Sequence, residues 1–439
     1  MDKRKRRVIE LGKDLLIVLL ACSGAYMAAD LMLMDGLSSL WQKESSTSTG
    51  IVERQETAST VWPVRLAVTS WNGESAMRYG VQYDWAECQT QFQTVASLLR
   101  EALSSPGVAR TAAEREWREA LSQRGSLYFD LLGSVPLGVL SGWLSGGETG
   151  LEGTARRLVL SVEGDSAMLY YQDSQTGMYY ARQAELVSVE QLQTVTAAVV
   201  DNGAKFAFEL DGYEDLQDET LLLPEAPQPR IYTAANPLSG ETQTEEVRTD
   251  SVLGRLLTAL SFPDSSYIYS GTDQVIRSGN DTLRLSASGV VRYAAADEEV
   301  SRYLVSAQGE IPTQFEIAEA CRALAEKAAG ALAGEGRLFL REMKQEQGGW
   351  TVQFGYQLDG IAVQVGEQGY AAHFRVEGNE IVQFTMQLRT YTDAESRSVV
   401  LPERQAVAAM QSMELEGKEL ILVYPDLGGD TLSAGWVAD

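Results

Sequence analysis

The sequence predicts an α+β protein, with an N-terminal transmembrane helix followed by a multi-domain extracytoplasmic region in which helices pack on antiparallel β-meanders. Two observations predict this class. A block of five basic residues, Lys3–Arg7, precedes a long apolar stretch near the N-terminus. Towards the C-terminus, segments of alternating apolar and polar residues are joined by two-residue turn sequences and flanked by helical patterns. This arrangement is typical of antiparallel strands packed against helices.

The N-terminal pattern predicts the topology. Residues from Leu15 to Ala29 are apolar or small, and the apolar character resumes after Asp30, so Leu15–Leu37 is long enough to cross a lipid bilayer whose core is about 30 Å thick. By the positive-inside rule the basic tail stays in the cytoplasm and the bulk of the chain lies outside the cell membrane. Two alternatives remain open, a cleaved signal peptide and a lipoprotein, since Leu19–Cys22 loosely resembles a lipobox.

One face of the expected membrane helix is a candidate contact for a partner helix. Ala21, Ala25 and Ala29 follow one another at intervals of four residues, and such small faces let helices approach closely in lipid. Asp30, near the outer end of the span, could also contact a partner. The alternative is a plain anchor whose small residues are incidental and whose Asp30 is simply interfacial.

Charge limits the classes of partner. The 439 residues carry a formal net charge of −25. Residues 1–14 hold six basic and three acidic side chains, a charge of +3, so the remainder carries −28. A surface this negative repels phosphate backbones, so we expect no nucleic-acid partner. It is typical of a protein that stays soluble in a salty exterior.

The exported part divides by composition. A serine- and threonine-rich stalk precedes strand and helix patterns, and acidic residues with four prolines then interrupt regular structure within 211–248. The expected order is a cytoplasmic basic tail (1–14), a transmembrane helix (15–37), a polar stalk (38–60), an N-terminal α+β ectodomain (61–210), an acidic proline-containing linker (211–248), a small middle α+β unit (249–310) and a C-terminal unit of helix plus antiparallel meander (311–439).

The C-terminal unit has the clearest local signals. Thr313 and Glu316 have the spacing of a capping box, which predicts a helix that runs to about Ala333. Asp359-Gly360 and Gly378-Asn379 separate alternating segments, and both pairs predict type I′ hairpin turns with positive φ at the two central residues. A further helix is expected after Pro402 and a closing strand at Leu420–Tyr424.

No motif predicts a reaction, so we expect no catalytic, cofactor or metal site. The single histidine, His373, excludes zinc sites built on several histidines, and we expect it on a solvated face beside Arg375. Leu144–Glu148 resembles the signature loop of ABC ATPases, but the phosphate-binding motif that acts with it is missing, so we interpret residues 138–153 as a flexible glycine loop. Cys321 is expected in a core, and a bridge to Cys88 has no support in the sequence.

The layout of a basic tail, one span and an ectodomain of helices and meanders resembles the YycH/YycI regulatory proteins. Local similarity lies in Gly279–Leu285 running into Gly289–Tyr293, and in Trp350 through Asp359-Gly360 to the segment with Tyr424 and Trp436. At 439 residues the chain is nearer the YycH-like members. These proteins are accessories of the essential WalK (YycG) cell-wall sensor kinase of Gram-positive bacteria.

The resemblance implies a non-enzymatic function in signal transduction. A protein of this kind modulates a two-component sensor histidine kinase through transmembrane and ectodomain contacts, together with a YycI-like sister protein. The helix-plus-meander unit also resembles PepSY-type domains, so an exported binding or protease-modulating module is an alternative. The many carboxylates leave a carboxylate-based cell-envelope enzyme as a second alternative.

Overall fold

The computed structural model describes residues 62–71, 75–146, 149–239, 251–262, 267–269, 273–278, 281–295, 301–307, 311–346, 348–413 and 419–438. All of them belong to one compact unit, Ile51–Asp439. The expected tail, membrane helix and stalk lie outside the described residues. Within these residues, no helix combines the length and the apolar character needed to cross a membrane.

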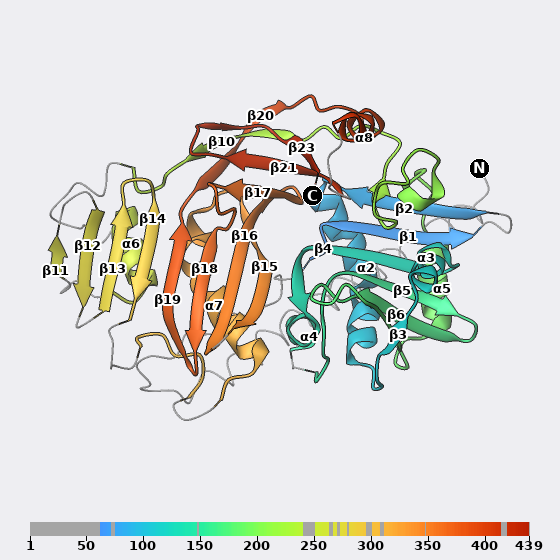
Figure 1. Ribbon diagram of the computed structural model, residues 1–439, viewed down its shortest axis with the longest axis horizontal. Coiled ribbons are helices and arrows are strands. Elements are labelled where there is room, and N and C mark those ends of the chain that lie inside the picture. Colours follow the sequence, from blue (N-terminus) through green and yellow to red (C-terminus); the bar gives the residue numbers. More distant parts are fainter. Residues whose placement is uncertain are drawn as a thin grey trace, which may run out of the picture. The chain divides into compact units, whose positions relative to one another are not determined.

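An antiparallel seven-stranded sheet occupies the N-terminal half, in the order β2-β1-β4-β5-β6-β7-β3 (Figure 1). Both faces of this sheet are buried. In β5, for example, Leu158 and Leu160 belong to the core that includes the apolar side of α2, whereas Val159 packs with Trp117 of α3. The elements are β1 (Arg65–Trp71), β2 (Ala76–Gln82), α2 (Trp85–Ser104), β3 (Arg110–Ala112), α3 (Glu114–Ser122), β4 (Ser126–Pro136), α4 (Leu137–Ser145), β5 (Thr154–Glu163), β6 (Ser166–Gln172), β7 (Tyr179–Gln183) and α5 (Val189–Ala197).

A second, eleven-stranded sheet combines the expected middle and C-terminal units, because β14 pairs with β19. Helices α6 and α7 lie behind this sheet in Figure 1. Its pairs are antiparallel except for β17 and β21, which run parallel. The elements are α6 (Val252–Ala259), β11 (Tyr267–Tyr269), β12 (Asp273–Ser278), β13 (Asp281–Ser286), β14 (Val290–Ala294), α7 (Gln314–Ala328), β15 (Arg337–Glu346), β16 (Gly349–Leu358), β17 (Ile361–Val365), β18 (Ala372–Glu377), β19 (Glu380–Gln387), β21 (Leu420–Asp426) and β23 (Gly435–Ala438).

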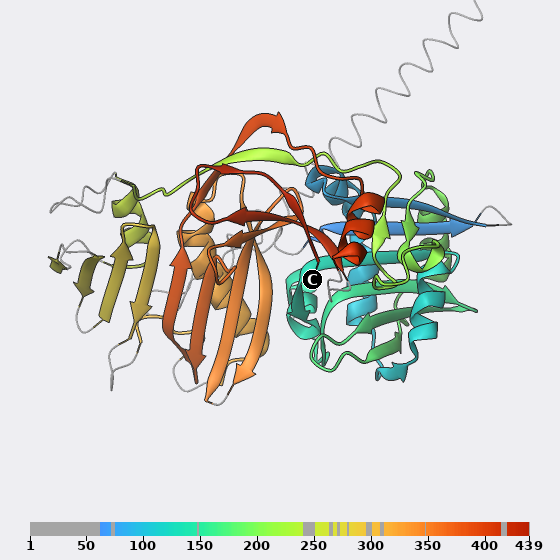
Figure 2. The same cartoon turned by 45° about the horizontal axis from the view of Figure 1, so that its top comes forward.

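The segment expected as a linker contributes to the fold. Figure 2 shows β10 (Arg230–Ala235) running beside β20 (Thr390–Arg397), and β22 (Thr431–Leu432) completes a three-stranded sheet with them. Two short strands, β8 (Lys205–Phe206) and β9 (Leu221–Leu222), also pair in this part of the chain. The proline-containing segment therefore lies against residues about 160 positions further along the chain.

Local predictions in the C-terminal unit are largely confirmed. The Thr313 side chain accepts from the Glu316 N–H, and Glu316 in return accepts from the Thr313 N–H, so α7 begins with the expected capping box. The helix ends at Ala328, and a short 3₁₀ turn, Gly330–Leu332, continues it towards the predicted end. After Pro402, helix α8 (Glu403–Ser412) buries Val407 and Met410.

One of the two predicted type I′ turns is confirmed and the other is wrong in type. Asp359 and Gly360 both have positive φ, +51° and +80°. At the second hairpin only Gly378 has positive φ, +56°, so the pair has the type II′ pattern, with glycine at the first central position. The strands still pair across it, with Glu377 opposite Glu380, because glycine alone supplies the left-handed residue that this turn needs.

The prediction of a flexible glycine loop over residues 138–153 is wrong for the first half of that segment. Residues Leu137–Ser145 form the buried helix α4. Gly142 faces the ring of Phe315, and a Cβ added there would lie only 2.3 Å from the ring atom Cδ2. Glycine in this segment therefore serves close packing between α4 and the start of α7.

Candidate functional site

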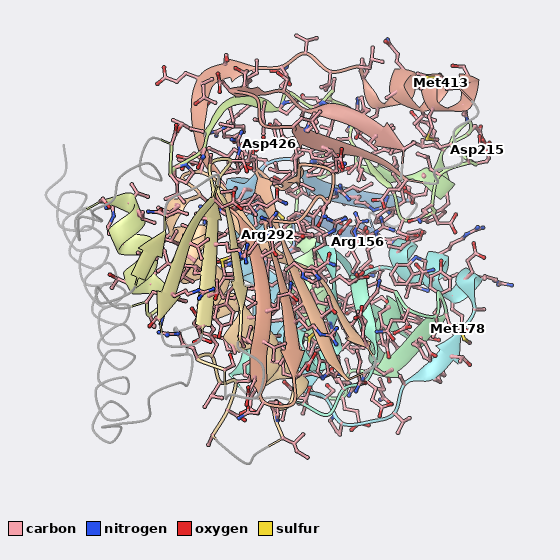
Figure 3. The ribbon with its side chains drawn as sticks, turned by 60° about the vertical axis from the view of Figure 1, so that its left-hand side comes forward. Arg156, Met178, Asp215, Arg292, Met413 and Asp426 are labelled. Atoms are coloured by element: carbon pink, nitrogen blue, oxygen red, sulfur yellow. The ribbon has the colours of Figure 1, made fainter. Side chains whose placement is uncertain are left out.

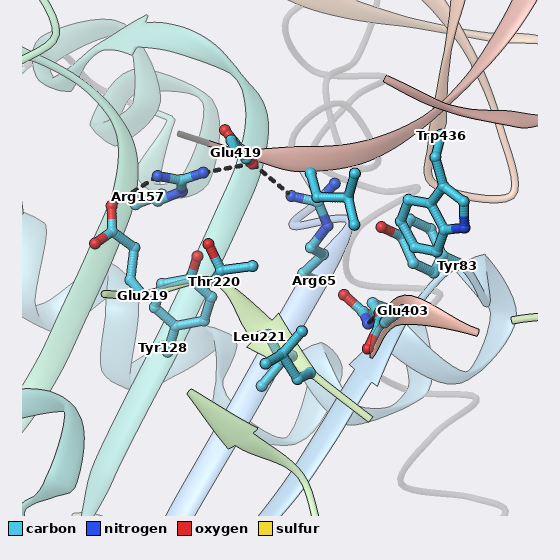
Figure 4. Close-up of a pocket in the computed structure, with 13 residues that line it drawn as sticks. Arg65, Tyr83, Tyr128, Arg157, Glu219, Thr220, Leu221, Glu403, Glu419 and Trp436 are labelled. Atoms are coloured by element: carbon cyan, nitrogen blue, oxygen red, sulfur yellow. Dashed lines mark hydrogen bonds and ion pairs between the residues drawn. The ribbon is translucent and has the colours of Figure 1, made fainter. Parts of the chain in front are cut away.

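The two large sheets meet at a buried junction to which six ionisable side chains contribute. Figure 4 shows Arg157 reaching towards Glu219 on one side and Glu419 on the other. Asp130 lies in β4, Arg65 in β1, and Arg156 and Arg157 in β5, whereas Glu419 immediately precedes β21. The junction therefore joins the N-terminal sheet to the C-terminal end of the described chain.

These side chains form one connected network of ion pairs. Arg65 donates to Asp130 at 2.7 Å, and Arg156 donates to the same carboxylate at 2.9 Å. Arg156 and Arg157 each donate to Glu419, at 2.8 and 2.6 Å. Arg157 also donates to Glu219 at 2.6 Å. Three guanidinium groups thus face three carboxylates, and the buried charges balance.

The network keeps Asp130 and Glu419 ionised. Burial alone would raise the pKa of Asp130, but the attraction of Arg156, Arg65 and Arg157 outweighs burial and holds this pKa well below its usual range. The same balance, with Arg157 as the strongest partner, lowers the pKa of Glu419 to about 2. Breaking a buried pair of this kind leaves an uncompensated charge, so the network specifies how the two halves dock.

Glu403 behaves differently from the acids of the network. It is the first residue of α8 and is buried against β2 and the 222–223 segment. Its carboxylate accepts hydrogen bonds from Gln82 Nε2 at 2.8 Å and from the Leu223 N–H at 3.2 Å. Burial, only partly offset by these hydrogen bonds and by Arg65, raises the pKa of Glu403 to about 7. Glu403 therefore changes charge near neutral pH.

An open cleft adjoins Glu403. Its volume is about 330 Å³, and it lies between the start of α8 and the segment that connects the N-terminal sheet to β10. The floor is apolar, with Leu222 and Leu223, and the rim carries Lys205 and Arg404. The residues that line it are Gly203, Lys205, Leu210, Tyr213, Leu222, Leu223, Pro224, Glu225, Ala226, Pro402, Glu403 and Arg404. A cleft of this size can hold a short side chain or loop of a partner.

The arrangement is suited to docking and pH response. The Glu403 carboxylate accepts hydrogen bonds from the Gln82 amide and the Leu223 N–H, so both of its oxygens are engaged within the fold. Within the described residues, no group of three or more His, Cys, Asp or Glu side chains is placed to hold a metal ion. His373 lies on β18 beside the ring of Tyr370, at 5.3 Å between centroids. It shares the face of Arg375 as expected, and both side chains are half-buried.

The structure tests only part of the sequence-derived site. Ala21, Ala25, Ala29 and Asp30 lie outside the described residues, so a contact with a partner helix stays a prediction. Cys321 is buried as expected, and both it and Cys88 are free thiols. The buried junction was missed. The adjacent Arg156 and Arg157 in an otherwise apolar strand are the one sequence signal that pointed to buried acids nearby.

No protein-family model matches the chain, and no curated protein matches it. A comparison with solved structures finds the crystal structure of YycH from Bacillus subtilis, with a TM-score of 0.52 and 10% sequence identity. The match covers 89% of this chain and 96% of that chain. The described residues therefore have a YycH-like fold, with mixed helices and antiparallel sheets.

Proposed function

We propose that this chain is a membrane-anchored, extracytoplasmic regulatory protein that modulates a two-component sensor histidine kinase. The YycH-like fold, which spans 89% of the chain, is the observation that carries the proposal. The basic tail and the apolar Leu15–Leu37 support the anchor, and they match the layout that suggested the YycH/YycI proteins from sequence. A YycI-like sister protein is the second proposed partner, and the lipid bilayer holds the chain.

The proposed role is non-enzymatic. The cleft of about 330 Å³ adjoins Glu403, whose pKa is raised to about 7, and this carboxyl group accepts hydrogen bonds from Gln82 and Leu223. At the junction, Asp130 and Glu419 are held in ion pairs with arginines. Such an arrangement supports docking of a partner and a response to its binding.

Deletion of the gene tests the proposal. We expect the phosphorylated fraction of the kinase's response regulator to change at least several-fold, and expression of the full chain to restore it. The full chain should also co-purify with the kinase from membranes. Unchanged phosphorylation together with no co-purification would contradict the proposal.

Two variants separate the parts that carry the coupling. Ala25→Leu widens the closest approach of the membrane helix and leaves residues 61–439 intact. We expect it to alter phosphorylation while the amount of protein in the membrane stays the same. If Ala25→Leu has no effect but removal of residues 61–439 abolishes regulation, the coupling lies in the ectodomain and the helix is only a tether.

A further inference from the structure

Over β12, β13, β14, β19 and β18, one face of the eleven-stranded sheet is covered by helices and the other is open. On the covered face, Leu283, Val291 and Phe384 are buried in the core that also contains Ile317 and Leu324 of α7. The residues that alternate with these strand positions point to the opposite side. Figure 1 shows α6 and α7 behind the strands, and Figure 3 labels Arg292 over the open side of the sheet.

The open side carries an array of arginines, which we call the basic face and define as Arg277, Arg284 and Arg292. All three are exposed. Arg284 lies directly opposite Arg292 in the register of β13 and β14. Arg277 lies on β12 opposite Thr282, in the cross-strand row next to the one that contains Arg284 and Arg292. Like charges that face each other across neighbouring strands are destabilising, so the fold tolerates a local cost here.

None of the three arginines makes an ion pair or a hydrogen bond with the described residues. Some other surface arginines of this acidic protein are paired: Arg115 contacts Glu119 at 2.7 Å, and Arg375 on β18 contacts Glu377 at 2.7 Å. The arginines of the basic face differ in that they lie together on neighbouring strands. A chain of net charge −25 has many carboxylates that could have been placed beside the basic face. Within the described part of the chain, the three guanidinium groups of the basic face have no carboxylate partner.

The side chains around the basic face are mixed: Val275 lies opposite Arg284, and polar residues lie towards β19 and β18. Thr385 lies beside Arg292 in the β14–β19 register, and His373 lies beyond Thr385 on β18. Gln383 is opposite Ala294 in the next row. Among the described side chains of β12, β13, β14, β18 and β19, none is a large exposed apolar residue, which favours a polar partner over a lipid surface.

We propose that the basic face binds an acidic segment of a partner protein. Guanidinium groups bind carboxylates through paired, charge-assisted hydrogen bonds, and interleaved threonine and glutamine side chains can bond to a peptide backbone. Charge complementarity is strong, because the rest of the chain repels the same segment and so directs it to this side. The inference rests on the proposed function only in that it takes the partner to be a protein.

Binding of a labelled polyglutamate peptide tests the proposal without the kinase. The full chain is placed in phosphatidylcholine nanodiscs, and fluorescence anisotropy measures the dissociation constant at low salt. We expect replacement of Arg277, Arg284 and Arg292 by Gln to weaken binding about tenfold, since each exposed charge pair contributes a fraction of a kcal/mol. Added salt should weaken binding to the parent chain more than binding to this variant.

A matched variant replaces three exposed arginines outside the basic face, Arg100, Arg124 and Arg255, by Gln, so the net charge changes equally. It should bind within about twofold of the parent if the face is the site. Equal weakening in both variants, or no weakening in either, would overturn the proposal. Binding to phosphatidylglycerol vesicles without binding to polyglutamate would overturn it in favour of a membrane surface. Because the assay contains no kinase, its failure leaves the gene-deletion result intact.

Discussion

Two buried carboxyl groups at the same junction respond to pH in opposite directions. The pKa of Glu419 is lowered to about 2, so its stabilising contribution is present above its ordinary value of 4.5 and is lost as the pH falls from 4.5 towards 2. The pKa of Glu403 is raised to about 7, so the folded chain holds a proton that the unfolded chain has released. That contribution is fully present below pH 4.5 and is lost as the pH rises through 7.

Replacement of Glu403 by Gln should remove the second of these dependences. A glutamine keeps the shape and cannot ionise, and Gln82 can turn its amide to accept a hydrogen bond from it. We expect the free energy of unfolding of Glu403→Gln to exceed that of the parent by about 2 kcal/mol at pH 8, and by little or nothing at pH 5. Urea unfolding of the full chain, followed by tryptophan fluorescence at the two pH values, measures the difference.

Glu225, which is exposed on the rim of the same cleft, provides the control. Glu225→Gln should change stability by less than about 0.5 kcal/mol at either pH. An effect of Glu403→Gln that is the same at pH 5 and pH 8 would show that packing, and not ionisation, is responsible.

At the scale of elements, the contact between β4 and β15 depends on one glycine. A Cβ added at Gly133 would lie 1.9 Å from the carbonyl oxygen of Leu340. We expect Gly133→Ala to lower the free energy of unfolding by about 2 kcal/mol, because the backbones of the two sheets must separate to admit the methyl group. Gly150 has no atom within 4 Å of such a Cβ, so Gly150→Ala should be neutral or slightly stabilising. Equal effects of the two substitutions in urea unfolding would rule out a tight contact at Gly133.

Elements defined by neighbouring residues could be predicted from the sequence, and elements defined by distant ones could not. The start of α7 depends on Thr313 and Glu316, which are three residues apart, and the Asp359-Gly360 hairpin depends on the turn itself. In contrast, β10 is a strand because β20 and β22 pair with it. Residues 230–235 carry no local pattern that announces those partners, so the segment was expected to be a linker.

The candidate site could not be predicted either, because its contacts also join residues that are far apart in the sequence. Glu403 and Gln82 are 321 residues apart, and the pKa of Glu403 is raised by burial that only the folded chain creates. In sequence, Glu403 is an ordinary acid in the first turn of a helix, where acids are common. Residue type and spacing therefore predicted helix α8 correctly, but they gave no indication that the pKa of Glu403 is raised.

At the scale of the whole molecule, the proposed topology places residues 61–439 outside the cell. Protease added to intact protoplasts should digest this region and leave a short fragment held in the membrane, because the basic tail keeps the N-terminus inside. Immunoblotting with a tag at each end distinguishes the two ends of the chain, and lysed protoplasts provide the control in which both ends are accessible. A C-terminal tag that survives in intact protoplasts would contradict the topology.

The buried junction has a consequence for the order in which the protein is made. Arg65 and Glu419 are 354 residues apart, so the three arginines of the junction and their partners Asp130 and Glu219 leave the ribosome long before Glu419, the third carboxylate of the network. Until Glu419 is made, the three guanidinium groups have only two of their three carboxylate partners, and the network lacks its link to β21. A premature stop codon anywhere before Glu419 would therefore leave the junction unfinished, and the truncated chain would expose buried surface to cellular proteases.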